Sequence, residues 1–282
     1  MTLTADGANL QAAYQLLNER YGTAIELELD AAWNDSLTTL LSHRSVRAYR
    51  PDPLPAGTLE ILIAAAQSAS SSSNLQTWSV IAVEEAARKQ RLSQLANNQS
   101  YIRQAPLFLV WLADLARLTQ IAHQRGLPHD GLNYLEMFLM AAIDASLAAQ
   151  NAVVAAELLG LGTVYIGAMR NNPLAVAAEL GLPKQVFAVF GLCVGYADPA
   201  AATVIKPRLP QAAVLHRETY SLDQNAAIDD YNNIMTAFYA NQQMNVAGDW
   251  AQHSSERIAS SEALRNRAHL REILYQLGFE LR

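Results

Sequence analysis

Two short basic clusters are the residues of this sequence whose types and spacing are best suited to chemistry. The first is the segment His43–Arg47, which reads HRSVR, and the second is Lys206-Pro207-Arg208. They stand out because the chain carries a formal net charge of −6 and contains only three lysines. Arginine presents fork-shaped donors that match phosphate oxygens, and lysine adds a point charge. The two clusters therefore predict that distant segments hold one phosphorylated cofactor.

Familiar catalytic motifs do not occur in the sequence. It contains no G-x-G-x-x-G after a strand, no Walker A lysine loop and no G-x-S-x-G elbow. The six histidines lack an H-x-x-x-H spacing with an acidic companion, so we expect no metal site. Cys193 lies in a strand-like apolar run, which indicates a buried, inert thiol. If the protein is an enzyme, we expect its reactive group to be a cofactor.

Composition indicates a globular protein long enough to bury a large core. The 282 residues are 51% hydrophobic and 16% charged. The negative net charge argues against a surface for nucleic acid or anionic membrane. No apolar run has transmembrane length, and the N-terminus lacks the features of a signal peptide. A single cysteine excludes an intramolecular disulfide and fits a reducing compartment, so we expect a cytoplasmic protein.

Helix patterns must position the two basic clusters. A helix from about Asn9 to Tyr21, ended by Gly22, forms a predicted N-terminal extension over residues 1–32. Asn34 caps a second helix that delivers His43 and Arg44 at its end. Further helices are expected at 58–68, 86–96, 132–159, 173–181, 221–239 and 264–277, and strands at 78–83, 106–112, 163–166 and 186–194. The expected helices and strands do not alternate strictly along the chain. This order favours an α+β fold with helices around one sheet, in a single domain over 33–282.

Two loops add weaker candidates for a binding site. Gly167-Ala168-Met169-Arg170 follows a strand and precedes a helix capped by Asn172, so its backbone N–H groups can meet an anion or a polar ring edge. Serines 71–73 can donate hydroxyls to a ligand. Each loop is also compatible with an ordinary connection, and the arginines with surface ion pairs. Only the combination favours a site.

Five segments, taken in order, resemble the FMN-dependent nitroreductase superfamily, most closely its oxygen-insensitive NADPH nitroreductase and flavin reductase branch. They read HRSVRAYRPDPLP, SASSSSNLQ, LGTVYIGAMRNNP, VFAVFGLCVGYADP and KPRLP. The resemblance covers roughly residues 43–210 well and the C-terminal helices weakly. It implies a mixed, largely antiparallel sheet surrounded by helices, in an intertwined homodimer. C-terminal helices would embrace the partner, and FMN would lie at the dimer interface.

The resemblance also implies which residues bind the cofactors. The FMN-binding positions are His43, Arg44, Arg47, Ser71, Ser73, Gln99, Tyr165, Ile166, Gly167, Ala168, Lys206 and Arg208. No side chain is implied as catalytic, because the flavin N5 is the reactive centre. Arg267 matches an arginine that binds the NAD(P)H phosphate, with Arg265 and Arg271 as alternatives. The loop at 243–248 lacks the arginines that the branch carries there, so the donor is either NADPH or NADH.

The implied function is an FMN-dependent oxidoreductase that uses NAD(P)H to reduce nitroaromatics, quinones or flavins by a ping-pong mechanism. Its partners would be a small-molecule acceptor and a second copy of the chain. A dedicated flavin reductase that supplies reduced FMN, or a non-catalytic FMN-binding protein, remains an alternative. Without the resemblance, the sequence describes a plain α+β domain with surface arginines.

Overall fold

The computed structural model describes residues 7–25, 33–201 and 203–282. The chain forms two compact units. Unit 1 comprises Met1–Arg44 and Thr203–Leu264, and unit 2 comprises Ser45–Ala202 and Arg265–Arg282. The predicted boundary between residues 32 and 33 remains a prediction.

Among the described residues, unit 2 is built on a four-stranded antiparallel sheet of order β1-β2-β4-β3. The strands are β1 (Trp78–Val83), β2 (Leu107–Asp114), β3 (Gly162–Ile166) and β4 (Val186–Gly195), close to where the patterns predicted them. Ser45 adds a parallel bridge to Thr163. All residues of β2 are buried, because helices cover both faces of the sheet. The predicted α+β fold with a mixed, largely antiparallel sheet is confirmed.

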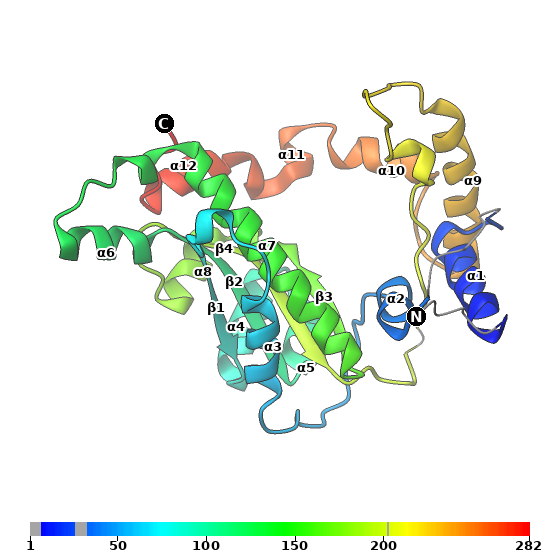
Figure 1. The fold of residues 1–282 in the computed structure, drawn as a ribbon, viewed down its shortest axis with the longest axis horizontal. Coiled ribbons are helices and arrows are strands. Elements are labelled where there is room, and N and C mark those ends of the chain that lie inside the picture. Colours follow the sequence, from blue (N-terminus) through cyan, green and yellow to red (C-terminus); the bar gives the residue numbers. More distant parts are fainter. Residues whose placement is uncertain (1–6, 26–32, 202) are drawn as a thin grey trace, which may run out of the picture. The chain divides into compact units, whose positions relative to one another are not determined.

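Helices form a layer on each face of this sheet, and Figure 1 shows α3 and α7 in front of it and α4 and α5 behind. The front layer is α3 (Thr58–Gln67) and α7 (Leu135–Leu158), and the rear layer contains α4 (Ala86–Leu95), α5 (Ser100–Gln104) and α8 (Pro173–Leu180). Successive strand residues point to opposite faces. Leu109 and Trp111 of β2 therefore pack toward α3 and α7, and Phe108 packs toward α4 and α5.

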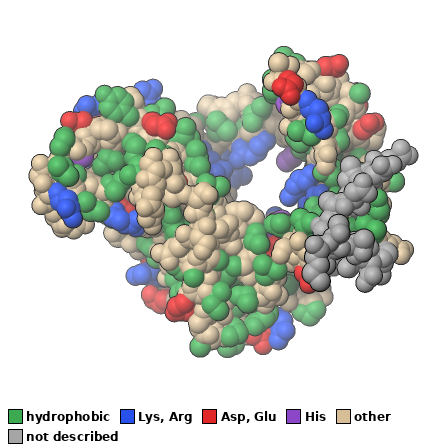
Figure 2. All heavy atoms as spheres, viewed as in Figure 1, with side chains coloured by type: hydrophobic (Ala, Val, Ile, Leu, Met, Phe, Trp, Pro, Cys, Tyr) green, Lys and Arg blue, Asp and Glu red, His purple; other side chains and the backbone are tan. Residues whose placement is uncertain are grey.

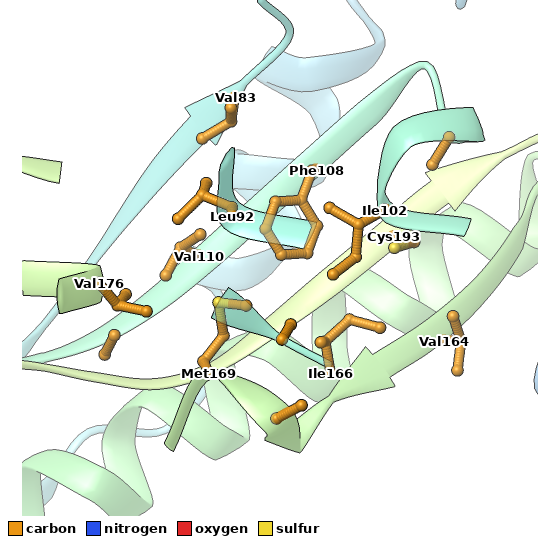
Figure 3. Close-up of a cluster of buried hydrophobic side chains, with 14 of the residues drawn as sticks. Val83, Leu92, Ile102, Phe108, Val110, Val164, Ile166, Met169, Val176 and Cys193 are labelled. Carbon is orange, nitrogen blue, oxygen red and sulfur yellow. The ribbon is translucent and has the colours of Figure 1, made fainter. Parts of the chain in front are cut away.

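Phe108 lies at the centre of the rear core (Figure 3). It is fully buried among Leu92, Ile102 and Met169. Its ring lies directly against Gly191 of β4, where an added Cβ would come within 2.3 Å of the ring. The absence of a side chain at Gly191 therefore allows the sheet and this ring to approach closely.

The central helix α7 confirms the helix that the alanine-rich pattern predicted at 132–159. Small inner side chains such as Ala148 and Ala152 let it lie close to β2 and α3. Its 24 residues and mean hydropathy of 1.5 are also compatible with a membrane span, but the core helix of a soluble protein has the same properties. Here the inner face is buried in the core, whereas the outer face exposes Leu139 and Ile143. On the face drawn in Figure 2, acidic, basic and hydrophobic side chains are interspersed over this unit.

Unit 1 consists of helices that are distant in sequence. They are α1 (Gly7–Tyr21), α2 (Asp35–Leu41), α9 (Asn225–Asn241), α10 (Trp250–Arg257) and α11 (Ser261–Leu264). The first two confirm predicted helices: Gly22 follows α1 at φ +69°, and Asn34 caps α2 by accepting a hydrogen bond from Leu37 N (3.0 Å). The core of unit 1 includes three buried side chains of α9, Tyr231, Met235 and Tyr239.

Asn172 is the N-cap residue of α8 (Pro173–Leu180) and Pro173 is its first residue, as predicted, but the Asn172 side chain does not cap the helix. The Asn172 side chain makes no capping hydrogen bond, and its amide donates to Leu95 O (2.8 Å) at the end of α4. Asn172 therefore connects two helices of the rear layer instead of satisfying the first N–H groups of its own helix. The helix α6 (Ala116–Arg125) is an addition that the pattern did not predict.

The predicted helix at 264–277 is not continuous. Arg265–His269 form a 3-10 segment, and α12 (Leu270–Gln276) follows it. Asn266 and Arg267 both hydrogen-bond back to Asn171, which lies far away in sequence. These tertiary hydrogen bonds override a periodicity that is compatible with one regular helix.

Candidate functional site

The serine loop between α3 and β1 is shaped by Asp144 of α7. Asp144 is only 2% exposed. Its carboxylate accepts hydrogen bonds from Ser71 Oγ (2.9 Å), Ser72 N (3.2 Å), Thr77 N (3.1 Å) and Thr77 Oγ1 (3.1 Å). Ser73 lies at the exposed turn with φ of 49°. Of the two predicted cofactor ligands in this loop, Ser71 therefore also holds the loop in place, and Ser73 is presented at its surface.

The end of β3 carries four predicted cofactor residues. Tyr165 is 38% exposed, whereas Ile166 and Ala168 are buried. A cavity of about 380 Å³ opens beside Tyr165 and Gly167, and it is lined by Ser146, Gln150, Tyr165, Gly167, Arg170 and Phe190. The Tyr165 ring meets the Phe190 ring edge-on, with 5.0 Å between centroids. The cavity therefore combines aromatic rings with amide, guanidinium and backbone groups, which suits a flat polar ligand.

Two arginines fix the turn that follows β3. Arg267 donates from Nη2 to Gly167 O (3.0 Å) and from Nε to Asn171 Oδ1 (3.0 Å). Arg170 donates to Val189 O, and burial lowers the pKa of Arg170 from its ordinary value. The predicted NAD(P)H-binding residue Arg267 thus holds the peptide that follows Gly167 in one orientation.

Arg47 lies near Tyr101 of α5, the short helix that follows Gln99. Burial raises the pKa of Tyr101 on this helix, and the positive charge of the neighbouring Arg47 guanidinium offsets part of that rise. Gln99 Oε1 is buried and has no hydrogen-bond partner among the described residues. A buried acceptor without a partner costs about 1–3 kcal/mol. Gln99 Oε1 is therefore a candidate contact for a ligand N–H or O–H group.

In unit 1, the segments that carry the two basic clusters lie side by side. Arg44 Nε donates to Thr203 Oγ1 (3.0 Å), across 159 positions of sequence. The side chains of Arg44, Lys206 and Arg208 are exposed, and His43 is half-buried. The structure therefore brings the segment containing His43 and Arg44 to the one containing Lys206 and Arg208, whereas Arg47 belongs to unit 2.

Arg20 of α1 connects these two segments. Its Nη2 donates to Leu41 O and His43 O, both at 2.8 Å, and its Nη1 donates to Lys206 O at 3.2 Å. The Arg20 side chain is 8% exposed. A guanidinium has several donors in one plane, which lets a single side chain satisfy carbonyl groups from different segments.

A cavity of about 720 Å³ opens beside these cations in unit 1. Arg20, Lys206 and Arg208 line one part of it, and the rest of the wall includes Tyr231, Met235, Tyr239, Met244, Val246 and Trp250. Lys206 Nζ lies 6.0 Å from the centroid of the Tyr239 ring. Aromatic faces stabilise a nearby cation, so the wall favours positive charge at this opening.

Sequence reasoning missed Arg20, Tyr101 and Asp144. Asp144 had a signal, because it is the only charged residue between Glu136 and Glu157 of an apolar helix, and a buried charge needs hydrogen-bond partners. Arg20 and Tyr101 had none. Their partners are tertiary, and the Arg20 contact to Lys206 spans 186 positions.

Among the residues that the structure describes, the other chemistry-bearing groups add neither a nucleophile nor a metal ligand set. Cys193 is fully buried, and burial raises the pKa of its thiol well above the usual range. Within the described ranges, no group of three or more His, Cys, Asp or Glu side chains could hold a metal ion.

Comparison with protein-family models gives two matches. The model described as "Nitroreductase family" matches residues 40–196, and the one described as "Nitroreductase family, C-terminal domain" matches residues 206–282. The helix α1 precedes both matched ranges.

Individual relatives are similar over nearly their whole length. An FMN reductase (NAD(P)H) of Bacillus subtilis is 41% identical over 253 residues, which cover 88% of this chain and 99% of that protein. An oxygen-insensitive NADPH nitroreductase of Salmonella typhimurium is 36% identical over 248 residues, covering 88% and 99%. The solved structure of B. megaterium NfrA2 is 39% identical, with a TM-score of 0.82, and covers 89% of this chain and 100% of that one.

Proposed function

This chain belongs to the nitroreductase family, and we propose that it reduces flat acceptors such as nitroaromatics, quinones or free flavins. It is an FMN-dependent oxidoreductase that takes its electrons from NAD(P)H. The observation that carries the proposal is the meeting of the two basic segments in unit 1, because one phosphorylated ligand requires cations that converge.

The residues present fit FMN. Its phosphate is an anion, and the joined segments of unit 1 expose Arg44, Lys206 and Arg208, of which Lys206 and Arg208 line the 720 Å³ cavity. Its ring carries polar edges, and Gln99 Oε1 in unit 2 is a buried acceptor whose partner is missing among the described groups. The cavity at Tyr165 and Gly167 adds aromatic and backbone surface. Unit 1 by itself therefore carries groups that match the charge of the cofactor, and unit 2 by itself carries groups that match its polar ring edges.

We assign the protein the roles of binding and orientation. FMN, when bound, supplies the redox chemistry, which is two-electron exchange with a nicotinamide and then with an acceptor. Arg47 of unit 2 or Lys206 of unit 1 would stabilise negative charge on the reduced ring. The fixed peptide after Gly167 would orient the ring edge. No side chain needs to act as an acid, because solvent can supply the proton.

We propose that the protein works as a cytoplasmic homodimer. The outer face of α7 exposes Leu135, Leu139, Ile143 and Leu147 in a row at four-residue spacing. An exposed apolar row on a helix of a globular protein indicates a partner surface. The single cysteine is a buried free thiol, which fits a reducing compartment.

The test of the proposed function is the visible absorbance spectrum of the purified protein under anaerobic conditions, before and after NADPH or NADH. We expect a flavin band that bleaches when either nucleotide is added. A flavin band that persists with both nucleotides would show that the protein binds flavin but does not accept electrons from NAD(P)H. A protein that stays colourless after mixing with FMN and desalting would overturn the proposal.

A dedicated flavin reductase is a second candidate, and the FMN reductases among the relatives favour it. The two functions differ in their acceptor. Turnover with free FMN well above that with a nitroaromatic or a quinone would favour the flavin reductase, and comparable rates would favour the broader oxidoreductase.

A further inference from the structure

The helix α1 lies outside the residues matched by the family models, yet it is bonded to the segments that carry the proposed phosphate-binding cations. The connection is Arg20, in the last turn of α1. Its buried guanidinium donates to Leu41 O and His43 O on one segment and to Lys206 O on the other. One side chain therefore sets the separation of the two segments.

The backbone of the second segment is held from two sides. Arg208 N donates to Arg20 O (2.8 Å), and the hydroxyl of Tyr231 on α9 donates to Pro207 O (2.9 Å). Pro207 is buried, whereas the Lys206 and Arg208 side chains on either side of it are exposed. The cations thus project from a backbone that α1 and α9 fix in place.

The end of α1 is fitted closely to this segment. Gly22 has a φ of +69°, which favours glycine. An added Cβ would come 2.4 Å from Ile234 Cγ2 on α9 and 3.3 Å from the Pro207 ring. The turn that follows Arg20 is therefore fixed by its packing against Ile234 of α9 and against Pro207.

Arginine suits the position for a geometric reason. A guanidinium presents its donors in fixed directions within one plane, and the three carbonyl oxygens bonded to Arg20 come from two different segments. A lysine ammonium is a single point charge on a flexible stem, so it cannot reach all three oxygens in the same way.

We propose that Arg20 is a positioning residue for the phosphate of FMN. It fixes the spacing between the cations of His43–Arg44 and those of Lys206–Arg208, so that both groups meet the same phosphate. The inference rests on the proposed function, which supplies the ligand. The helix α1 accordingly contributes to FMN binding by positioning the cations that hold the phosphate.

The test compares the full-length protein with Arg20→Lys and with Gln15→Ala, a change on the exposed side of the same helix. After removal of bound flavin, the affinities for FMN and for riboflavin, which has no phosphate, are measured by flavin fluorescence. For Arg20→Lys we expect FMN affinity about tenfold weaker, the factor typical for losing a hydrogen bond to a charged group. Riboflavin affinity should stay unchanged. Gln15→Ala should resemble the wild type with both ligands.

The outcomes separate the inference from the function. A wild-type protein that does not bind FMN would contradict the proposed function itself. FMN binding that is equal in wild type and Arg20→Lys would overturn only the inference, as would equal losses for FMN and riboflavin. Should Arg20→Lys fail to fold, Tyr231→Phe removes only the hydroxyl that holds Pro207 O. We expect the same FMN-selective loss from it, and an unchanged FMN affinity would overturn the inference.

Discussion

At the scale of single residues, Asp144 determines whether the serine loop keeps its shape. Replacing it with alanine would leave the N–H groups of Ser72 and Thr77 without their acceptor. We expect Asp144→Ala to lower the free energy of unfolding by about 3 kcal/mol, the upper end for unsatisfied buried donors. Asp144→Asn keeps one acceptor oxygen and should cost less. Urea unfolding measures both.

The matched control for Asp144 is Ser146→Ala, on the exposed side of the same helix. It should change stability by no more than about 0.5 kcal/mol, as most surface substitutions do. If Asp144→Ala were as stable as this control, the loop would not depend on the carboxylate. FMN affinity should also fall in Asp144→Ala, because the loop carries Ser71 and Ser73 of the proposed site.

Cys193 should be unreactive in the folded protein. Its thiol is fully buried, and burial raises its pKa, so the neutral thiol persists to higher pH than the usual pKa of about 8.5. Because the thiolate is the nucleophile, we expect no reaction with a disulfide reagent at pH 8 in the native state. One thiol per chain should react in denaturant. Fast labelling of the native protein, at the rate of a free thiol, would contradict this prediction.

At the scale of elements, the loop between α9 and α10 bears on the choice of nucleotide. Residues 243–248 carry no cation, and Met244 on this loop is 40% exposed beside the 720 Å³ cavity. A missing arginine–phosphate contact is typically worth about 1.5–3 kcal/mol. We therefore expect the kcat/KM values for NADPH and NADH to lie within about tenfold of each other.

The same loop offers a gain-of-function test. Met244→Arg should raise the NADPH-to-NADH ratio of kcat/KM by about tenfold, the effect of one hydrogen bond to a charged group. Met244→Gln, which has similar length but no charge, should leave the ratio unchanged. A wild-type preference for NADPH of more than about a hundredfold would contradict the expectation for this loop.

Elements with strong periodicity or clear caps could be predicted from the sequence. The buried run of β2, the alanine-rich α7 and the Asn34 cap of α2 are local patterns, and each forms where it was expected. The C-terminal helix could not be predicted correctly, because Asn266 and Arg267 are drawn to Asn171 by tertiary hydrogen bonds. Periodicity describes which face is apolar, and it contains no information about such contacts.

At the scale of the whole molecule, the cationic residues of the proposed site were easier to predict than the residues that hold them in position. The two basic clusters were conspicuous in an acidic chain, and the structure joins those in unit 1. The groups that position them, such as Arg20, lie in a segment without a motif and act through backbone oxygens. Any carbonyl can accept such a bond, so the sequence around the acceptors carries no signal.

The outer face of α7 is the surface that we expect to join two chains. Leu135, Leu139, Ile143 and Leu147 are 45–54% exposed, and they form one stripe because residues four apart lie on the same side of a helix. A charge placed in the middle of this stripe would be buried without a partner in a dimer. It would remain hydrated in a monomer.

Ile143→Glu should therefore convert a dimer into monomers. We expect light scattering to give twice the mass of one chain for the wild type and the mass of one chain for the variant. If FMN lies at the dimer interface, as the resemblance to the family implies, the variant should also lose FMN on desalting. Gln124→Glu, which adds the same charge to the exposed helix α6, should remain a dimer with bound FMN. A dimeric Ile143→Glu protein would show that another surface joins the chains.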